Sequence, residues 1–170
     1  MLITRREALM TGAGLAAGLA MAPSTAWPEA GATFFPWTRL ADGLHAVVDP
    51  QTGGNSLLIV GSDAAALVDT KYPAIAQALL RESRAFGPPL RHVINTHHHG
   101  DHMDASDWGP SRLMESDNTT LTVGARTVQL THFGQNAHTD NDTVVFLPDA
   151  NLLHTGDLVF SGLHPYFDPS

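Results

Sequence analysis

The sequence contains no cysteine among its 170 residues, which excludes a disulfide framework and a thiolate site for a soft metal. Lysine is almost missing too, because Lys71 is the only one, and the formal net charge at pH 7 is −8. A surface this acidic repels phosphate backbones. We therefore expect no nucleic-acid binding through a basic patch. The sequence has no internal repeat, heptad or low-complexity segment, and its 43% hydrophobic and 15% charged residues indicate one compact domain.

The first 26 residues are expected to be a signal peptide of the twin-arginine type. Arg5 and Arg6 precede an uncharged run rich in Ala, Gly and Leu, and Ser24-Thr25-Ala26 supplies the small residues that a signal peptidase needs. The run is too short and too rich in glycine to span a membrane. We therefore expect residues 27–170 to be periplasmic or secreted by a bacterium, without a stable membrane anchor. The alternatives are an ordinary N-terminal helix and an uncleaved anchor.

Residues 27–170 alternate between β-prone runs and one helical pattern. The helix is predicted over 73–86, with Ile75 and Leu79 near helical spacing, Pro73 in the first turn, and Gly87-Pro88-Pro89 as a stop. Short runs of strand formers between Gly and Pro residues predict strands at 42–48, 55–61, 63–69 and 90–96, and hairpins at 119–133 and 142–160. Met103 to Asn118 is expected to be mainly loop. This order favours an α/β sandwich.

Histidine is unusually frequent in this sequence. Ten are present, and several follow the last strand before the loop, in the stretch THHHGDH at 96–102. In a nearly extended segment alternate side chains share a face, so His97, His99 and Asp101 converge while His98 points elsewhere. Gly100 permits a tight turn that aims His102 back toward them. Imidazole and carboxylate groups suit a borderline cation such as zinc.

Zinc prefers four ligands, so the remaining ligands are expected from distant loops. His138 lies immediately before a predicted strand, and Asp157 lies immediately after one. These two residues are the candidates that complete the site.

The pattern His97-x-His99-x-Asp101-His102 after an apolar strand resembles the signature of the metallo-β-lactamase-fold hydrolases. The stretch AHTDNDTVVFLPDANLLHTGD, at 137–157, is similar to the next two motifs of that superfamily, in the same order. The resemblance covers residues 40–160, most of the mature chain. It implies an αββα sandwich with the site at one edge, between the two sheets.

The resemblance also implies a role for each ligand. His97, His99 and His138 would hold one metal, Asp101 and His102 would contribute to a second, and Asp157 would bridge the two. Asp101 would in addition orient the attacking water and shuttle a proton. Asp69, at the end of a strand, matches a carboxylate that buttresses the histidine loop. We therefore expect one or two zinc ions per chain, with iron as the alternative metal.

The chain departs from the family pattern in three places. Met103-Asp104-Ala105 follows the first motif where relatives have small glycines, and only 35 residues separate His102 from His138. The sequence stops at Ser170, before the last histidine of the second metal site in relatives. We therefore expect a shortened relative or a fragment, with an incomplete C-terminal part. Missing helices would expose a sheet face or favour a homo-oligomer.

The predicted function is zinc-dependent hydrolysis of an ester, lactone, thioester or β-lactam bond in a small-molecule substrate. Two alternatives remain: an iron dioxygenase of the persulfide-oxidising kind, and a degenerate module that binds metal without turnover. His164 is a candidate substrate contact at the pocket mouth. The other histidines are expected to be structural, supporting or exposed rather than ligands: His92, His98, His132 and His154.

Overall fold

The computed structural model describes residues 33–49, 51–103, 117–134, 137–162 and 164. The predicted signal peptide and residues 104–116 of the predicted loop lie outside this part of the chain. All elements below belong to one unit, residues 32–170. Within the described residues, no helix has the length and apolar character needed to cross a membrane.

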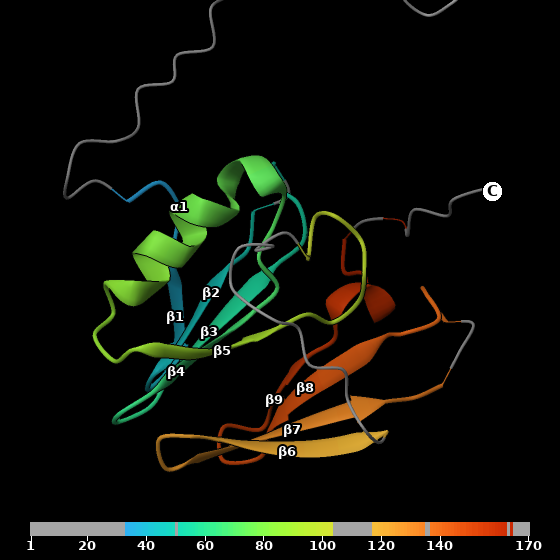
Figure 1. Cartoon of the computed structure of the whole chain (residues 1–170). Helices are drawn as coiled ribbons and strands as arrows, with labels where there is room; N and C mark the ends of the chain where they lie inside the picture. Colours follow the sequence, from blue (N-terminus) through green and yellow to red (C-terminus); the bar gives the residue numbers. More distant parts are fainter. Residues whose placement is uncertain (1–32, 50, 104–116, 135–136, 163, 165–170) are drawn as a thin grey trace, which may run out of the picture. The chain divides into compact units, whose positions relative to one another are not determined.

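The first sheet has five strands: β1 Thr38–Ala41, β2 Leu44–Val47, β3 Ser56–Val60, β4 Ala65–Val68 and β5 Leu90–Ile94. They lie in the order β1-β2-β3-β4-β5 (Figure 1). Neighbours are antiparallel except β4 and β5, which are parallel. The four predicted strands are confirmed as β2 to β5. Sequence patterns missed β1, because three of its four residues are exposed and show no apolar alternation.

Helix α1, Pro73–Arg84, connects the two parallel strands and covers one face of the first sheet (Figure 1). It begins with Pro73 in its first turn, as predicted, and ends two residues before the predicted limit. Its buried side chains, including Leu79 and Leu80, pack against Leu58 and Leu67 of the sheet. The parallel connection places the carboxyl ends of β4 and β5 at the same edge.

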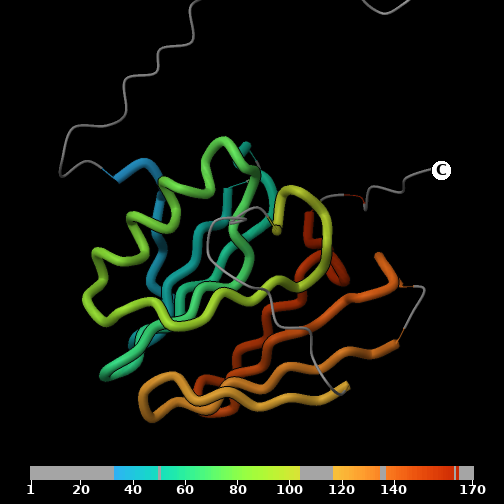
Figure 2. The backbone as a smooth tube through the Cα atoms, in the orientation of Figure 1, coloured from blue at the N-terminus to red at the C-terminus, as the bar shows by residue number. Residues whose placement is uncertain are grey.

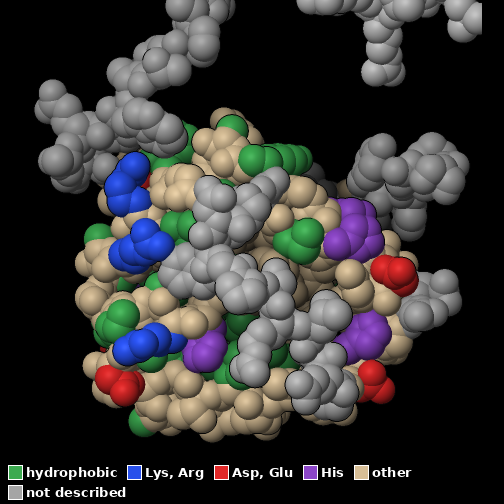
Figure 3. Space-filling view, in the orientation of Figure 1, with side chains coloured by type: hydrophobic (Ala, Val, Ile, Leu, Met, Phe, Trp, Pro, Cys, Tyr) green, Lys and Arg blue, Asp and Glu red, His purple; other side chains and the backbone are tan. Residues whose placement is uncertain are grey.

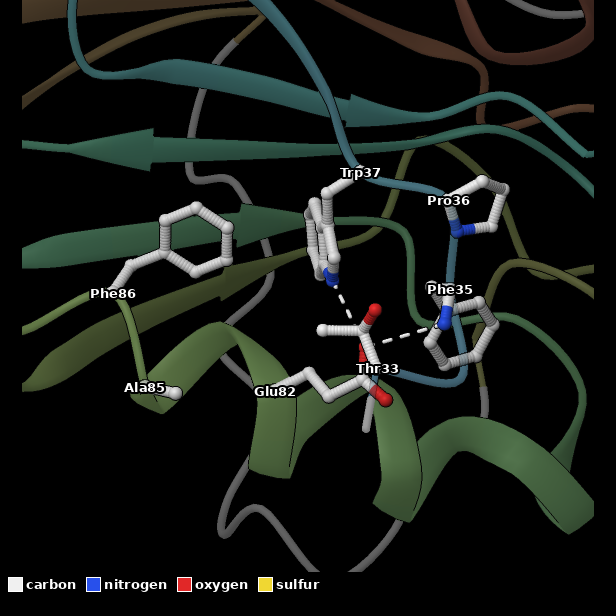
Figure 4. A pocket seen from close by; sticks show the side chains of 7 residues that line it. All are labelled: Thr33, Phe35, Pro36, Trp37, Glu82, Ala85 and Phe86. Atoms are coloured by element: carbon white, nitrogen blue, oxygen red, sulfur yellow. Dashed lines mark hydrogen bonds between the residues drawn. The ribbon is translucent and has the colours of Figure 1, made fainter. Parts of the chain in front are cut away.

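A buried carboxylate ties the segment before β1 to the helix. Glu82 Oε1 accepts a hydrogen bond from the Phe34 amide at 2.6 Å. Its Oε2 accepts one from the Phe35 amide at 3.3 Å and one from Trp37 Nε1 at 3.0 Å (Figure 4). The Trp37 ring meets Phe86 edge-on, with centroids 5.2 Å apart. This carboxylate therefore serves as a shared acceptor where the chain enters the domain.

The second sheet is antiparallel and follows the order of the sequence. Its strands are β6 Asn118–Val123, β7 Arg126–His132, β8 Thr143–Leu147 and β9 Leu152–His154. Both predicted hairpins are confirmed. The last strand is shorter than predicted, because a 3-10 helix, Gly156–Leu158, replaces its second half.

The two sheets face each other across one apolar core. Leu57, Ile59 and Val68 of the first sheet pack with Val128 and Val145 of the second. At one end the turns touch through bare backbone, since a Cβ on Gly61 would lie 2.5 Å from Val123 O and a Cβ on Gly124 would lie 2.5 Å from Ser62 N. Glycine is therefore required at this contact.

The layers are thus one helix, then two sheets, in agreement with the first three layers of the predicted αββα sandwich. On the outer face of the second sheet, Thr120, Gln129, Phe146 and Leu153 form a row across the four strands. The row changes from polar to apolar along its length, and Leu153 is 53% exposed. Among the residues that the structure describes, no helix covers this face.

Candidate metal centre

Three loop segments meet at the end of the sandwich opposite the glycine contact. Residues 95–103 follow β5, residues 137–142 precede β8, and residues 155–158 follow β9 (Figure 2). The Thr143 amide donates to the Thr96 carbonyl at 2.8 Å, which joins the first two segments. The space-filling view shows histidine and acidic side chains together at the right of one face, while Lys and Arg side chains lie on the left, also beside histidine and acidic side chains (Figure 3).

His97, His99 and His138 form the first group of ligand atoms, all within 4.8 Å of one another. His138 Nε2 lies 3.0 Å from His99 Nδ1. Three imidazole nitrogens at such separations can surround a zinc ion, which binds nitrogen at about 2.0–2.1 Å. His98 instead is exposed, with its Nδ1 3.2 Å from Asn141 Oδ1. The histidines alternate between the cluster and the surface, as the sequence predicted.

His97, His102 and Asp157 form the second group, again within 4.8 Å. Asp157 Oδ1 lies 3.3 Å from His102 Nε2, and its Oδ2 lies 3.6 Å from His138 Nε2. The carboxylate therefore stands between the two groups. Asp101 lies beside the second group, with Oδ2 3.6 Å from His102 Nε2. The structure brings together every ligand candidate from the sequence: His97, His99, Asp101, His102, His138 and Asp157.

Two buried nitrogens test whether these residues fit a metal. His97 Nε2 and His102 Nε2 are buried and have no hydrogen-bond partner. The nearest carboxylate oxygen to His102 Nε2 belongs to Asp157 and lies 3.3 Å away, without forming a hydrogen bond to it. A buried polar atom left unpaired is costly, and a cation bound to both nitrogens would satisfy them. A donor set of imidazole nitrogen and carboxylate oxygen suits zinc and similar metals.

The two buried imidazoles differ in their proton affinity. Burial, helped by repulsion from His102, lowers the pKa of His97 to about 4. For His102, burial acts in the same direction, but the carboxylates of Asp157 and Asp69 outweigh it and raise its pKa to about 10. His97 is therefore neutral at pH 7 and presents a free lone pair. His102 must lose a proton when a cation binds.

Asp69 holds the histidine loop from beneath. It is fully buried, and it accepts hydrogen bonds from the Thr96 amide at 2.8 Å, His102 Nδ1 at 2.9 Å and His154 Nε2 at 3.0 Å. Burial pushes its pKa upward, but the hydrogen bonds from His102 and His154 prevail and hold the pKa well below its usual range. Because His102 donates through Nδ1, its Nε2 faces the cluster. Asp69 occupies the buttress position implied by the resemblance.

Comparisons with known proteins agree with this geometry. A model of the metallo-beta-lactamase superfamily matches residues 49–108. Among solved structures, the metallo-beta-lactamase DIM-1 is similar, with 20% identity and a TM-score of 0.63 over 75% of this chain and 72% of that one. TMB-1 has 18% identity and a TM-score of 0.64 over the same shares. A metallo-beta-lactamase from Pontibacter korlensis has 18% identity and a TM-score of 0.57, over 68% of this chain and 67% of that one. A search of curated proteins finds no significant match.

The chain has the metallo-β-lactamase fold, and its residues 49–108 match the model of that superfamily. The family model covers the segment from the end of β2 through the histidine loop. The similar solved structures extend the likeness in fold to about three quarters of the chain. At these identities the structures establish the fold, so the chemistry of this metallo-β-lactamase-fold chain rests on its own residues.

In this metallo-β-lactamase-fold chain a second buried aspartate fixes the loop that carries His138. Asp142 accepts hydrogen bonds from the Thr139 amide at 2.8 Å and from Thr139 Oγ1 at 2.7 Å. Burial acts to raise its pKa, but the bonds from Thr139 outweigh burial and lower it. The carbonyl of Asp142 meets His132 Nδ1 at 2.9 Å. His138 is therefore held on a closed turn.

Four further histidines take supporting or exposed positions. His154 contacts Asp69 and His132 contacts the turn before β8, as described above, so both support the loops that carry ligands. His92 lies half-buried in β5, and His164 is exposed. None of these four belongs to either group of ligand atoms in the described part of the chain.

Sequence reasoning missed several residues that shape the site. Thr96 joins Asp69 to the histidine loop, and its Oγ1 lies 3.0 Å from His97 Nδ1. The Thr139-x-x-Asp142 spacing is a turn signal that could have identified Asp142. Gly100 lies in the predicted turn before His102, and its backbone there is not in the left-handed region.

Proposed function

We propose that this chain is a metal-dependent hydrolase that directs water at an ester, lactone, thioester or β-lactam bond of a small molecule. The observation that carries the proposal is the buried, unpartnered Nε2 of His97, a residue that belongs to both groups of candidate ligands. A polar atom in this state, among further histidine and aspartate ligands, is what a cation site requires before its ion binds.

The two groups of ligands would differ in strength. His97, His99 and His138 would hold the tighter zinc ion, with Asp157 or water as the fourth ligand. Asp101 and His102, sharing Asp157, would hold a second ion more weakly. The buttress from Asp69 supports His102 but adds no ligand of its own.

Zinc held by these residues would lower the pKa of its bound water toward about 7 and would polarise a substrate carbonyl. Asp101 would supply the proton transfer. Its carboxylate is 26% exposed and lies 3.6 Å from His102 Nε2, so it reaches both the cluster and solvent. It would accept the proton of the attacking water and return it to the leaving group.

The substrate class rests on the fold and the ligand set. DIM-1, one of the similar structures, is a metallo-beta-lactamase that was exposed to ceftazidime. This chain has no cysteine, so its second group uses only imidazole and carboxylate. We therefore propose hydrolysis at a carbonyl-type bond and include β-lactams as one substrate among several.

The proposal is tested by measuring both the metal content of the protein and its turnover of substrates. Protein purified without a histidine tag is analysed for its metals, then assayed with ester, lactone, thioester and β-lactam substrates beside a His99→Ala variant. We expect zinc, with turnover that the variant loses. Full zinc without any turnover would contradict hydrolysis and favour a binding module. Iron with thiol-dependent oxygen uptake would favour the dioxygenase.

A further inference from the structure

The backbone of the loop between β2 and β3 packs closely against His102 and Asp101 of the candidate metal centre. A methyl group on Gly54 would overlap Cε1 and Nε2 of the His102 ring. A Cβ on Gly53 would lie 2.9 Å from the Cβ of Asp101, and the φ of Gly53 is +90°, which favours glycine. Side chains larger than hydrogen therefore do not fit at Gly54 while His102 keeps its position.

Lys71 holds this loop in place. It is fully buried, and its Nζ donates a hydrogen bond to the Gly54 carbonyl. The nearby carboxylates of Asp49, Asp69 and Asp101 partly compensate its charge, although burial still lowers its pKa to about 8. Lys71 also has a left-handed backbone conformation, with φ at 65°. Both the burial of its charged group and this positive φ cost free energy. Such a residue is retained only where its surroundings fix it.

Three consecutive residues act on the same histidine. Asp69 accepts from the Nδ1 of His102. The Thr70 amide donates to the His102 carbonyl at 2.8 Å. Lys71 fastens Gly54, whose backbone meets the edge of the ring that carries Nε2. The side chain of His102, its backbone and the loop that faces its ring are thus all positioned by residues 69–71.

We propose that Lys71 and the Gly53-Gly54 backbone form a latch that positions His102 and Asp101 and thereby sets how tightly the second ligand group holds its cation. This inference rests on the proposed function. Lys71 is a positioning residue, since it touches the loop and no proposed ligand directly. The contacts of the latch go to His102 and Asp101, so the group of His97, His99 and His138 is expected to work without it.

The test is a titration of the metal-free full chain with zinc against a chromophoric chelator, which resolves two stepwise affinities. Gly54→Ala and Lys71→Met should each weaken the second equivalent by about 10-fold or more, the range for lost support of a ligand. The first equivalent should change by less than about 3-fold. Gln51→Ala is the matched control, because Gln51 is exposed in the same loop as Gly53 and Gly54.

The double variant Gly54→Ala/Lys71→Met tests whether Lys71 and Gly54 act together or independently. If Lys71 acts through Gly54, the double variant should be no more than about 3-fold weaker than the worse single variant, whereas independent losses would multiply. Cobalt(II) absorption of the second equivalent should change in both single variants and stay unchanged in Gln51→Ala. Circular dichroism of the metal-free proteins identifies any variant that fails to fold, and the other single variant then decides.

Equal effects of the variants on both equivalents, or no effect on the second, would overturn the latch. A wild-type chain that takes up one equivalent only would also overturn it, while leaving the proposed hydrolase intact. Binding of no metal by the wild-type chain would remove the proposed function and the latch together.

Discussion

At the scale of single residues, the direction of each side chain in the histidine loop decides its role. His97 and His99 face His138, whereas His98 faces solvent and Asn141. We predict that His97→Ala and His99→Ala each lower turnover by more than about 100-fold, because loss of a ligand should exceed the 10–100-fold cost of losing its support. His98→Ala should stay within about 3-fold. Steady-state kinetics with matched zinc contents checks this, and equal losses at His98 and His99 would contradict the assignment.

Proton uptake gives a second prediction at this scale. In the metal-free chain, His97 has a pKa of about 4 and His102 one of about 10, against 6.5 for an ordinary histidine. Between pH 4 and 6.5 the unfolded chain binds the extra proton at His97, so stability rises with pH. Above 6.5 the folded chain keeps the proton of His102 that the unfolded chain loses, so stability falls. Lys71, with its pKa lowered to about 8, opposes this fall only at higher pH.

The free energy of unfolding of the metal-free chain should therefore be greatest near pH 6.5. It should fall by about 1–2 kcal/mol between pH 6.5 and 8, since each pKa unit corresponds to about 1.4 kcal/mol. Urea unfolding at a series of pH values measures it. His102→Gln should remove the falling limb and keep the rising one. A flat profile of the wild-type chain above pH 6.5 would contradict the raised pKa of His102.

At the scale of elements, α1 depends on a contact with the segment before β1. Glu82→Ala would leave the amides of Phe34 and Phe35 and the indole of Trp37 without their acceptor. We predict a loss of about 2–4 kcal/mol in the free energy of unfolding, because each unsatisfied buried donor costs about 1–3 kcal/mol and part of this surface reaches water. Urea unfolding measures it.

Gln77→Ala is the control on the same helix. Gln77 is exposed, so its replacement should change stability by less than about 0.5 kcal/mol. Similar losses for the two variants would show that Glu82 does not fasten the segment.

Local patterns predicted most elements, and contacts between distant residues account for what they missed. Strands β2 to β5, α1 and both hairpins follow from alternation, helical spacing and Gly or Pro punctuation. Glu82 shows the limit, since it lies among polar residues of a helix and its partners are 45 to 48 residues away. Lys71 was noticed only for its rarity, because nothing in its neighbours indicates a buried contact with Gly54. The ligand cluster was predictable because three motifs of the resemblance occur in register.

At the scale of the whole molecule, export remains a prediction from the first residues of the sequence. Replacing Arg5 and Arg6 with lysine should hold the precursor in the cytoplasm, since the twin-arginine route requires the arginine pair. Fractionation of a bacterial host, followed by mass analysis of the N-terminus, measures this. Unchanged periplasmic recovery of a cleaved product from the lysine variant would contradict the route.

The close approach of Gly61 and Gly124 has a mechanical consequence. It joins the sheets at one end, while His97 and His99 follow a strand of the first sheet and His138 and Asp157 flank strands of the second at the other end. An ion held by residues from both sheets would act as a cross-link at the end away from that pivot. There it would resist forces that open the sandwich, so metal loading would stiffen the end that carries the candidate metal centre.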